Sequence, residues 1–212
     1  MKRIVILISG RGSNMEALLK AQLPCKIAAV ISNKADATGL AIAQQYGITT
    51  AAISHKDFAS REDFDAALAQ QIDRFQPDFV VLAGFMRILT AGFVNHYAGR
   101  LINIHPSLLP AYTGVHTHER ALADGVRIHG CTVHFVTAEL DHGPIIVQAA
   151  VPVLPGDTVQ SLSARVLQQE HQIFPQAIRW LCSKKLWLAD DGRVTSSHAA
   201  PISTALISPA LD

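Results

Sequence analysis

The start of the chain is its most constraining feature. A run of five apolar residues, 4–8 (IVILI), is followed by the glycine-containing stretch 9–14 (SGRGSN) and then by a helical segment over 15 to about 22, which Pro24 ends. Runs rich in β-branched residues are typical of a strand buried on both faces of a parallel sheet. A strand, a tight loop and a helix in this order indicate an α/β unit.

The same alternation continues along the chain. Further strands are predicted over 27–31, 79–83, 101–105, 132–136 and 145–151, and helices over 39–46, 61–75 and 158–181. We therefore expect an α/β fold: a Rossmann-like, mostly parallel, twisted sheet of about seven strands with helices on both faces. A single domain is expected over 1–188. Periodicity fades after it, which predicts a loosely packed tail over 189–212.

Composition excludes several classes of function. Apolar residues make up 49% of the 212 residues, and 18 basic against 17 acidic residues leave a net charge of +1. Nucleic-acid binding would need a basic surface, and a membrane span or signal peptide would need a longer apolar run. The three separated cysteines form no disulfide framework. We expect a cytoplasmic protein with small-molecule substrates, no nucleic-acid or membrane partner, and a monomeric or homodimeric state.

The glycine stretch after the first strand is the first candidate site. A helix N-terminus after such a loop favours an anion, because its amide groups and the helix dipole both point at it. The dinucleotide fingerprint fails, since Met15 stands at the third glycine, and the Walker motif is not present. A single phosphate monoester fits better. The alternative, equally supported by these residues, is a tight turn with Ser13 and Glu16 as a capping box.

Asn103 and His105 form the second candidate site. On one strand they would share a face, roughly 6.5 Å apart, and Pro106 ends that strand at its carboxyl end, where α/β sheets bind ligands. The alternative is an Asn and a His satisfied by loop backbone. Asp141, in the loop 139–144, is by position a turn former. If its carboxylate reached His105, it would raise the pKa of the imidazole.

For the clustered histidines, Arg61 and Glu170, an ordinary structural role is favoured over a functional one. Six of the ten histidines fall between residues 105 and 142. They could form a zinc site with His116 and His118 as a ligand pair, but a loop or helix start fits that pair better. Arg61, at a helix start, favours a surface ion pair over a ligand contact. Glu170, in mid-helix, favours a solvated helix face.

Four motifs together resemble the folate-dependent formyltransferases, and most closely those that act on glycinamide ribonucleotide. The motifs are ISGRGSN (8–14), AGFMRIL (83–89), NIHPSLLP (103–110), and HFV with ELD (134–136 and 139–141). The resemblance extends from about residue 4 to 180. It implies an enzyme of de novo purine biosynthesis that transfers a formyl group from N10-formyltetrahydrofolate, its co-substrate, to the amine of glycinamide ribonucleotide, without a metal.

The resemblance also implies roles for individual residues. The residues implied to be catalytic are Asn103, His105 and Asp141. Asn103 and His105 would stabilise a tetrahedral intermediate, and Asp141 would raise the pKa of His105. The residues implied to bind the ribonucleotide are Gly12, Ser13 and Asn14 at its phosphate and Glu170 near its sugar. The residues implied to bind the folate are Arg61, Met86, Arg87, Ile88, Leu89 and Asn103.

Other functions share parts of this pattern and stay open at this point. A formyltetrahydrofolate hydrolase shares the three catalytic residues behind an additional N-terminal domain. A methionyl-tRNA formyltransferase shares them and adds a C-terminal RNA-binding domain. A metal-dependent hydrolase is an alternative from another class, and a chelator would abolish its activity. A non-catalytic ribonucleotide-binding module would have no need of His105.

Overall fold

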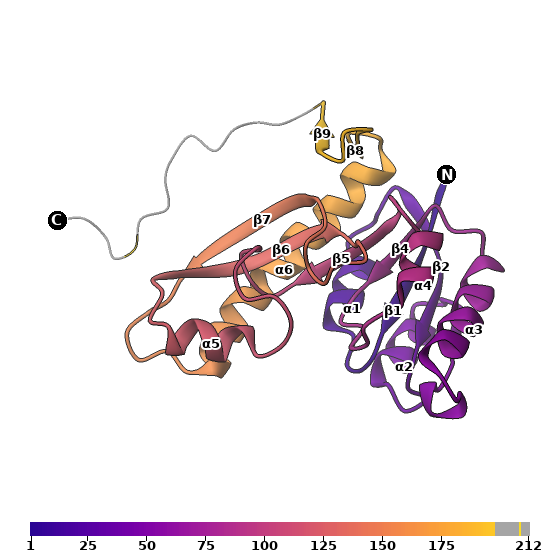
Figure 1. The fold of residues 1–212 in the computed structure, drawn as a ribbon, viewed down its shortest axis with the longest axis horizontal. Helices are drawn as coiled ribbons and strands as arrows, with labels where there is room; N and C mark the ends of the chain where they lie inside the picture. Colours follow the sequence, from indigo (N-terminus) through magenta and orange to yellow (C-terminus); the bar gives the residue numbers. More distant parts are fainter. Residues whose placement is uncertain (198–207, 209–212) are drawn as a thin grey trace. The chain divides into compact units, whose positions relative to one another are not determined.

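The structure is a computed structural model that describes residues 1–197 and 208 (Figure 1). The chain divides into two compact units. The first comprises Met1–Asn103 and Phe135–Glu139, and the second comprises Ile104–His134 and Leu140–Asp212.

The first unit contains the alternating elements predicted for the start of the chain. They are β1 (Lys2–Ile8), α1 (Ser13–Lys20), β2 (Cys25–Ser32), α2 (Thr38–Gln45), β3 (Thr50–Ala52), the short 3-10 helix η1 (His55–Asp57), α3 (Arg61–Asp73), β4 (Phe79–Leu82), α4 (Ala91–His96) and the start of β5 (Leu101–His105). β1 pairs in parallel with β2 and β4, β2 with β3, and β4 with β5. The apolar run 4–8 is fully buried in β1, as predicted.

The core of the first unit explains why α3 forms where it does. Phe64, Leu68 and Ile72 recur at intervals of four residues, so they lie on one face of the helix. All three are fully buried in one cluster with residues of β1, β2 and β4, such as Val5 and Val80. Burial of three large apolar side chains contributes on the order of 1.5–3 kcal/mol each.

The strand order places two loops of the first unit beside each other. The sheet has the order β3-β2-β1-β4-β5-β6-β7, where β6 (Ile128–Phe135) and β7 (Ile145–Pro152) are the last two strands. The chain therefore reverses direction across the sheet between β1 and β4, and ligands of open α/β sheets bind at such a switch point. The backbone N–H of Ser9, after β1, donates a 3.1 Å hydrogen bond to the carbonyl of Gly84, after β4.

The second unit combines an antiparallel strand pair with a long helix. It contains α5 (Thr117–Ala123), β6, β7, α6 (Val159–Cys182), β8 (Leu186–Leu188) and β9 (Val194–Ser196). β6 and β7 are antiparallel, and α6 lies along β7 (Figure 1). The buried residues Leu162, Val166, Phe174 and Ile178 form the apolar stripe of this helix.

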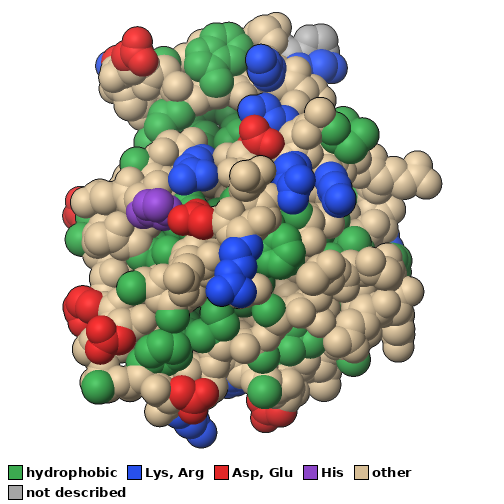
Figure 2. All heavy atoms as spheres, turned by 90° about the vertical axis from the view of Figure 1, so that its right-hand side faces the viewer, with side chains coloured by type: hydrophobic (Ala, Val, Ile, Leu, Met, Phe, Trp, Pro, Cys, Tyr) green, Lys and Arg blue, Asp and Glu red, His purple; other side chains and the backbone are tan. Residues whose placement is uncertain are grey.

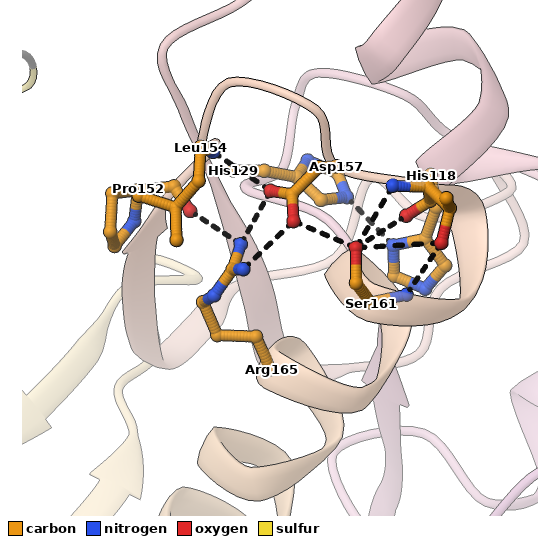
Figure 3. Close-up of polar contacts among 8 residues, drawn as sticks. His118, His129, Pro152, Leu154, Asp157, Ser161 and Arg165 are labelled. Carbon is orange, nitrogen blue, oxygen red and sulfur yellow. Dashed lines mark hydrogen bonds and ion pairs between the residues drawn. The ribbon is translucent and has the colours of Figure 1, made fainter.

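A charged cluster fixes the turn from β7 into α6 (Figure 3). The guanidinium of Arg165 donates to both carboxylate oxygens of Asp157, at 2.7 and 2.9 Å. The same carboxylate accepts from the backbone N–H of Leu154 and from the hydroxyl of Ser161, which forms a capping box with Thr158. These hydrogen bonds, above all that of Arg165, hold the pKa of Asp157 well below its usual range.

The predicted strands and helices are confirmed as elements, and their ends differ by up to a few residues. The strand expected over 132–136 begins four residues earlier, at Ile128. The elements that were not predicted are β3, η1, α4, α5, β8 and β9. The tail expected over 189–212 lies mostly outside the described residues, and β9, in its described part, pairs with β8.

Surface charge and helix hydrophobicity indicate whether the described residues could bind a nucleic acid or cross a membrane. On the face that Figure 2 draws, basic and acidic side chains both occur among apolar and uncharged ones, and neither sign of charge covers it. Within residues 1–197 and 208, no helix has the length and apolarity that crossing a bilayer requires.

Candidate active site

The second unit brings a buried imidazole and a buried carboxylate together. His105 is the last residue of β5, and Asp141 lies in the loop between β6 and β7. Oδ2 of Asp141 lies 3.5 Å from Nδ1 of His105, with side chains only 6% and 7% exposed. The backbone of Asp141 has φ 56°, a left-handed conformation in which Asp is more frequent than most residues. The turn and the contact with His105 are therefore both present.

Hydrogen bonds fix both partners of this pair. Oδ2 of Asp141 accepts a 2.8 Å hydrogen bond from the backbone N–H of Gly114. Nε2 of His105 lies 2.8 Å from the carbonyl oxygen of Tyr112. Both ring nitrogens of His105 thus face an acceptor oxygen. The ring of His105 is therefore held in one orientation.

A second histidine faces the same carboxylate. Oδ1 of Asp141 lies 3.9 Å from Nε2 of His134, which is 1% exposed near the end of β6. Each oxygen of Asp141 therefore faces one imidazole. His134 was not predicted as a site residue. Its place in the motif HFV, directly before the loop with Asp141, was the signal in the sequence.

The turn that follows His105 is tied to β6 and β7. The hydroxyl of Thr132 donates to the carbonyl of Ser107 at 2.7 Å and accepts from the N–H of Leu109 at 3.0 Å. The amide of Gln148 donates to the Leu109 carbonyl at 2.9 Å and to the Thr132 hydroxyl at 3.0 Å. Thr132 and Gln148 are partners in the strand register. This turn therefore cannot shift without breaking buried hydrogen bonds.

His118 and His129 form a pair of neutral imidazoles. Nδ1 of His118 lies 3.2 Å from Nε2 of His129, a contact drawn in Figure 3. Burial first, and the positive charge of a protonated His118 second, lower the pKa of His129 to about 4. Burial and the charge of His105 lower the pKa of His118 as well. Two buried rings this close cannot both be protonated without a large cost.

The histidines that the structure describes are not grouped as a metal site. His116 precedes α5 and pairs with Glu119 at 3.0 Å, while His118 contacts His129. The two residues considered as a ligand pair thus have different partners. They lie at the N-cap and in the first turn of α5, which agrees with the expectation of a loop or a helix start there. Among residues 1–197 and 208, no three His, Cys, Asp or Glu side chains are placed to hold a metal ion.

Asn103 lies on β5 in the first unit and is half-buried. It precedes His105 by two residues on that strand, so the alternation of a strand directs both side chains to one face. Sequence reasoning predicted this alternation, and the observed strand Leu101–His105 has the predicted ends.

The capping box considered for Ser13 and Glu16, at the end of the glycine stretch, is not formed. α1 begins at Ser13, and its N-cap is Gly12, in a left-handed conformation with φ 75° and no side-chain cap. Ser13 is therefore a helical residue rather than a cap, and Glu16 forms an ion pair with Lys20. The N-cap of α1 makes no side-chain hydrogen bond, and a helix N-terminus favours an anionic ligand.

The segment 86–89 lies in the loop after β4. The side chains of Met86 and Ile88 are 70% and 62% exposed, and exposed apolar side chains close together in one loop are a feature of ligand-binding surfaces. Arg61 does not act only as a surface charge, because its Nη2 donates a 2.7 Å hydrogen bond to the carbonyl of Ile88. The guanidinium of Arg87 lies over the ring of Phe64.

Glu170 corrects an expectation. It was expected on a solvated helix face, but it is buried, with 6% exposure, on the apolar stripe of α6. Its negative charge acts on Cys131 of β6. Burial first, and Glu170 second, raise the pKa of the Cys131 thiol to about 12. A buried carboxylate of this kind requires a specific polar environment.

A parallel sheet with a buried imidazole and carboxylate at a strand end defines an α/β enzyme. Residues 2–178 match the family described as formyl transferase. A phosphoribosylglycinamide formyltransferase of Escherichia coli K12 is 54% identical over 202 residues, 93% of this chain and 95% of that protein. The structure of the phosphoribosylglycinamide formyltransferase of Coxiella burnetii in complex with CHES is 49% identical, with a TM-score of 0.88, and covers 92% of this chain and 93% of that one. The chain belongs to the formyl transferase family and is a transferase, which confirms the resemblance.

Proposed function

We propose that this enzyme transfers a formyl group from N10-formyltetrahydrofolate to the amine of glycinamide ribonucleotide, in purine biosynthesis. The observation that carries the proposal is the buried contact between His105 and Asp141, at the end of the strand that also holds Asn103. The names of the relatives from Escherichia coli and Coxiella burnetii support the substrate, since both are phosphoribosylglycinamide formyltransferases.

In the proposed reaction the amine nitrogen attacks the formyl carbon directly. A C–N bond forms, the carbonyl oxygen becomes an oxyanion, and the bond to N10 of the folate then breaks. The side-chain amide of Asn103 and the imidazolium of His105 stabilise the oxyanion, a role worth about 3 kcal/mol for each donor. The attacking nitrogen loses a proton and N10 gains one. His105 or an ordered water carries that proton.

Asp141 holds the His105 ring in place for this role. Nδ1 faces the carboxylate, so Nε2 is the nitrogen that donates to the substrate. In the structure Nε2 faces the carbonyl of Tyr112 at 2.8 Å. The substrate oxygen therefore has to replace that carbonyl, through a shift of the backbone at Tyr112 that leaves the contact with Asp141 in place.

The remaining predicted residues divide between the two substrates. Gly12, Ser13 and Asn14 bind the phosphate of the ribonucleotide at the N-terminus of α1, and Glu170 lies near the sugar. The folate contacts Met86, Arg87, Ile88, Leu89 and Asn103. Arg61 contributes to the same site, and its hydrogen bond to Ile88 supports the loop that the folate contacts.

A spectroscopic assay tests the proposal. The purified chain is mixed with formylated folate and glycinamide ribonucleotide, and the deformylated folate is followed with each substrate omitted in turn. Turnover that requires both substrates, and that His105→Ala abolishes, supports the proposal. Release of deformylated folate without the ribonucleotide would indicate a formyltetrahydrofolate hydrolase instead. Turnover should persist in a chelator, since no step uses a metal.

We further propose a cytoplasmic location, because the cysteines Cys25, Cys131 and Cys182 are all free thiols, as in proteins of reducing compartments. A monomer or a homodimer is expected, and sedimentation at several protein concentrations distinguishes the two.

A further inference from the structure

A buried hydroxyl of the first unit contacts the segment that is proposed to bind folate. The side chain of Ser9, directly after β1, accepts a 2.7 Å hydrogen bond at Oγ from the backbone N–H of Met86. The backbone N–H of Ser9 donates to the carbonyl of Gly84 at 3.1 Å. Ser9 is 4% exposed. One residue thus joins the end of β1 to two positions of the loop after β4.

Asn33 determines the direction of this hydroxyl. The hydroxyl of Ser9 donates a 2.6 Å hydrogen bond to Oδ1 of Asn33, which directly follows β2 and is 2% exposed. A serine hydroxyl has one hydrogen. Because Asn33 takes that hydrogen, the lone pairs of Oγ are left for the N–H of Met86. Nδ1 of His55 lies 3.4 Å from Nδ2 of Asn33, and this contact orients the amide of Asn33.

The same loop is held at regular intervals by other side chains. The carbonyl of Ile88 accepts from Arg61 at 2.7 Å, and the N–H of Thr90 donates to the buried carboxylate of Asp65 at 2.6 Å. Together with the two hydrogen bonds of Ser9, these contacts give residues 84, 86, 88 and 90 each a hydrogen bond to a backbone group. The side chains of Met86 and Ile88 remain exposed between these points.

We propose that Ser9 and Asn33 are positioning residues for the folate donor: Asn33 orients the hydroxyl of Ser9, and that hydroxyl holds the backbone of Met86 in the shape that binds folate. The inference rests on the proposed function. It follows from the position of the contact, at the switch point of the sheet where β1 and β4 end. A loop that is already ordered loses less entropy when the ligand binds.

Three variants separate the roles of the two residues. Ser9→Ala removes the acceptor of Met86, and about a tenfold rise in the KM for formyl folate is expected. Asn33→Ala leaves the hydroxyl in place but free to rotate, and about a three- to fivefold rise is expected, with kcat and the KM for glycinamide ribonucleotide within about twofold of wild type. The double variant should match Ser9→Ala, because Asn33 acts only through Ser9.

Tyr97→Phe is the matched control for loss of a buried hydroxyl in the same unit. The Tyr97 hydroxyl lies 2.9 Å from Oδ1 of Asp73 and 3.2 Å from the carbonyl oxygen of Ala69, both in α3, and its one hydrogen is shared between them. This variant should lose stability without any change in the folate KM. An equal rise in folate KM in Tyr97→Phe, a folate KM unchanged in Asn33→Ala, or additive effects in the double variant would each overturn the proposal.

A measurement that needs no turnover keeps the inference separate from the proposed function. Amide hydrogen exchange, resolved by NMR, should show the N–H of Met86 protected in wild type and exchanging about tenfold faster in Ser9→Ala. Unchanged protection would contradict the role of the hydroxyl. If wild type shows that protection but does not turn over formyl folate, the proposed function fails, and with it the folate role assigned to these residues.

Discussion

Oδ2 of Asp141 lies 3.5 Å from Nδ1 of His105, and the contact is closed to solvent on both sides. The carboxylate comes from a loop in a left-handed turn, and the imidazole from the end of a strand. Their meeting therefore depends on the loop between β6 and β7 keeping its shape. The backbone N–H of Gly114 contributes to this by donating to the same oxygen.

Asp141→Asn should reduce kcat by about 100-fold or more, since general acid–base groups contribute about 10²–10⁴-fold. The amide keeps the shape of the side chain but loses the charge that complements a protonated His105. The measurement is kcat at saturating substrates. Glu119→Gln, which removes an exposed carboxylate that pairs with His116, is the control and should be unaffected. A kcat within about threefold of wild type in Asp141→Asn would contradict this role.

Gly39→Ala should weaken binding of the ribonucleotide. A Cβ at Gly39, in α2, would lie 2.6 Å from Cδ1 of Ile8 and 3.0 Å from the carbonyl of Gly10, so the glycine stretch has to move. A cost of about 1–3 kcal/mol in stability is expected, together with a higher KM for glycinamide ribonucleotide. Gly92→Ala is the matched control. It is a helical glycine with only one atom near the new Cβ, at 3.9 Å, and should be neutral or stabilising.

Stability should fall between about pH 6.5 and pH 4 because of His129. The folded state lowers its pKa to about 4, so in this window the unfolded chain binds a proton that the folded chain does not. The free energy of unfolding therefore decreases as the pH falls, by up to about 3 kcal/mol. Urea unfolding at pH 7.5 and 4.5 measures it. His129→Gln should show a smaller decrease, and an equal decrease would argue against His129 as the source.

Arg165→Lys should destabilise the second unit. Lysine keeps the charge but cannot donate to both oxygens of Asp157 in the geometry that the guanidinium has. A loss of about 1–2 kcal/mol, or roughly 2–8 °C in Tm, is expected. Arg193→Lys is the control, because Arg193 forms an exposed ion pair with Asp191 at 3.8 Å. If both substitutions lower Tm equally, the two hydrogen bonds from Arg165 to Asp157 contribute no more to stability than an exposed ion pair.

The long elements could be predicted from the sequence because burial leaves a periodic pattern. The run 4–8 and the four-residue spacing in α3 each correspond to an observed element. β3 and α4 span only three and six residues, so neither is long enough to show a period. The N-cap of α1 was misassigned to Ser13 for a related reason: residue types alone cannot show that Gly12 adopts a left-handed conformation.

The candidate site was predictable only in part. Strand alternation places Asn103 and His105 on one face, but nothing in local spacing shows that Asp141 reaches His105. The resemblance to a family suggested that contact before the structure did. Burial of Glu170, by contrast, could have been predicted, because Leu162, Val166 and Phe174 place position 170 on the apolar stripe of α6. The Ser9–Asn33 contact joins two loops, and no sequence pattern predicts it.

The rate at which the Cys131 thiol is alkylated reports how often the sheet opens at β6. Its pKa of about 12 and its complete burial make it inert to iodoacetamide in the closed state, because alkylation requires an exposed thiolate. Each alkylation event at this position therefore records one excursion in which β6 separates from its neighbours. The half-buried Cys25 supplies an internal reference in the same experiment, so no foreign label has to be introduced.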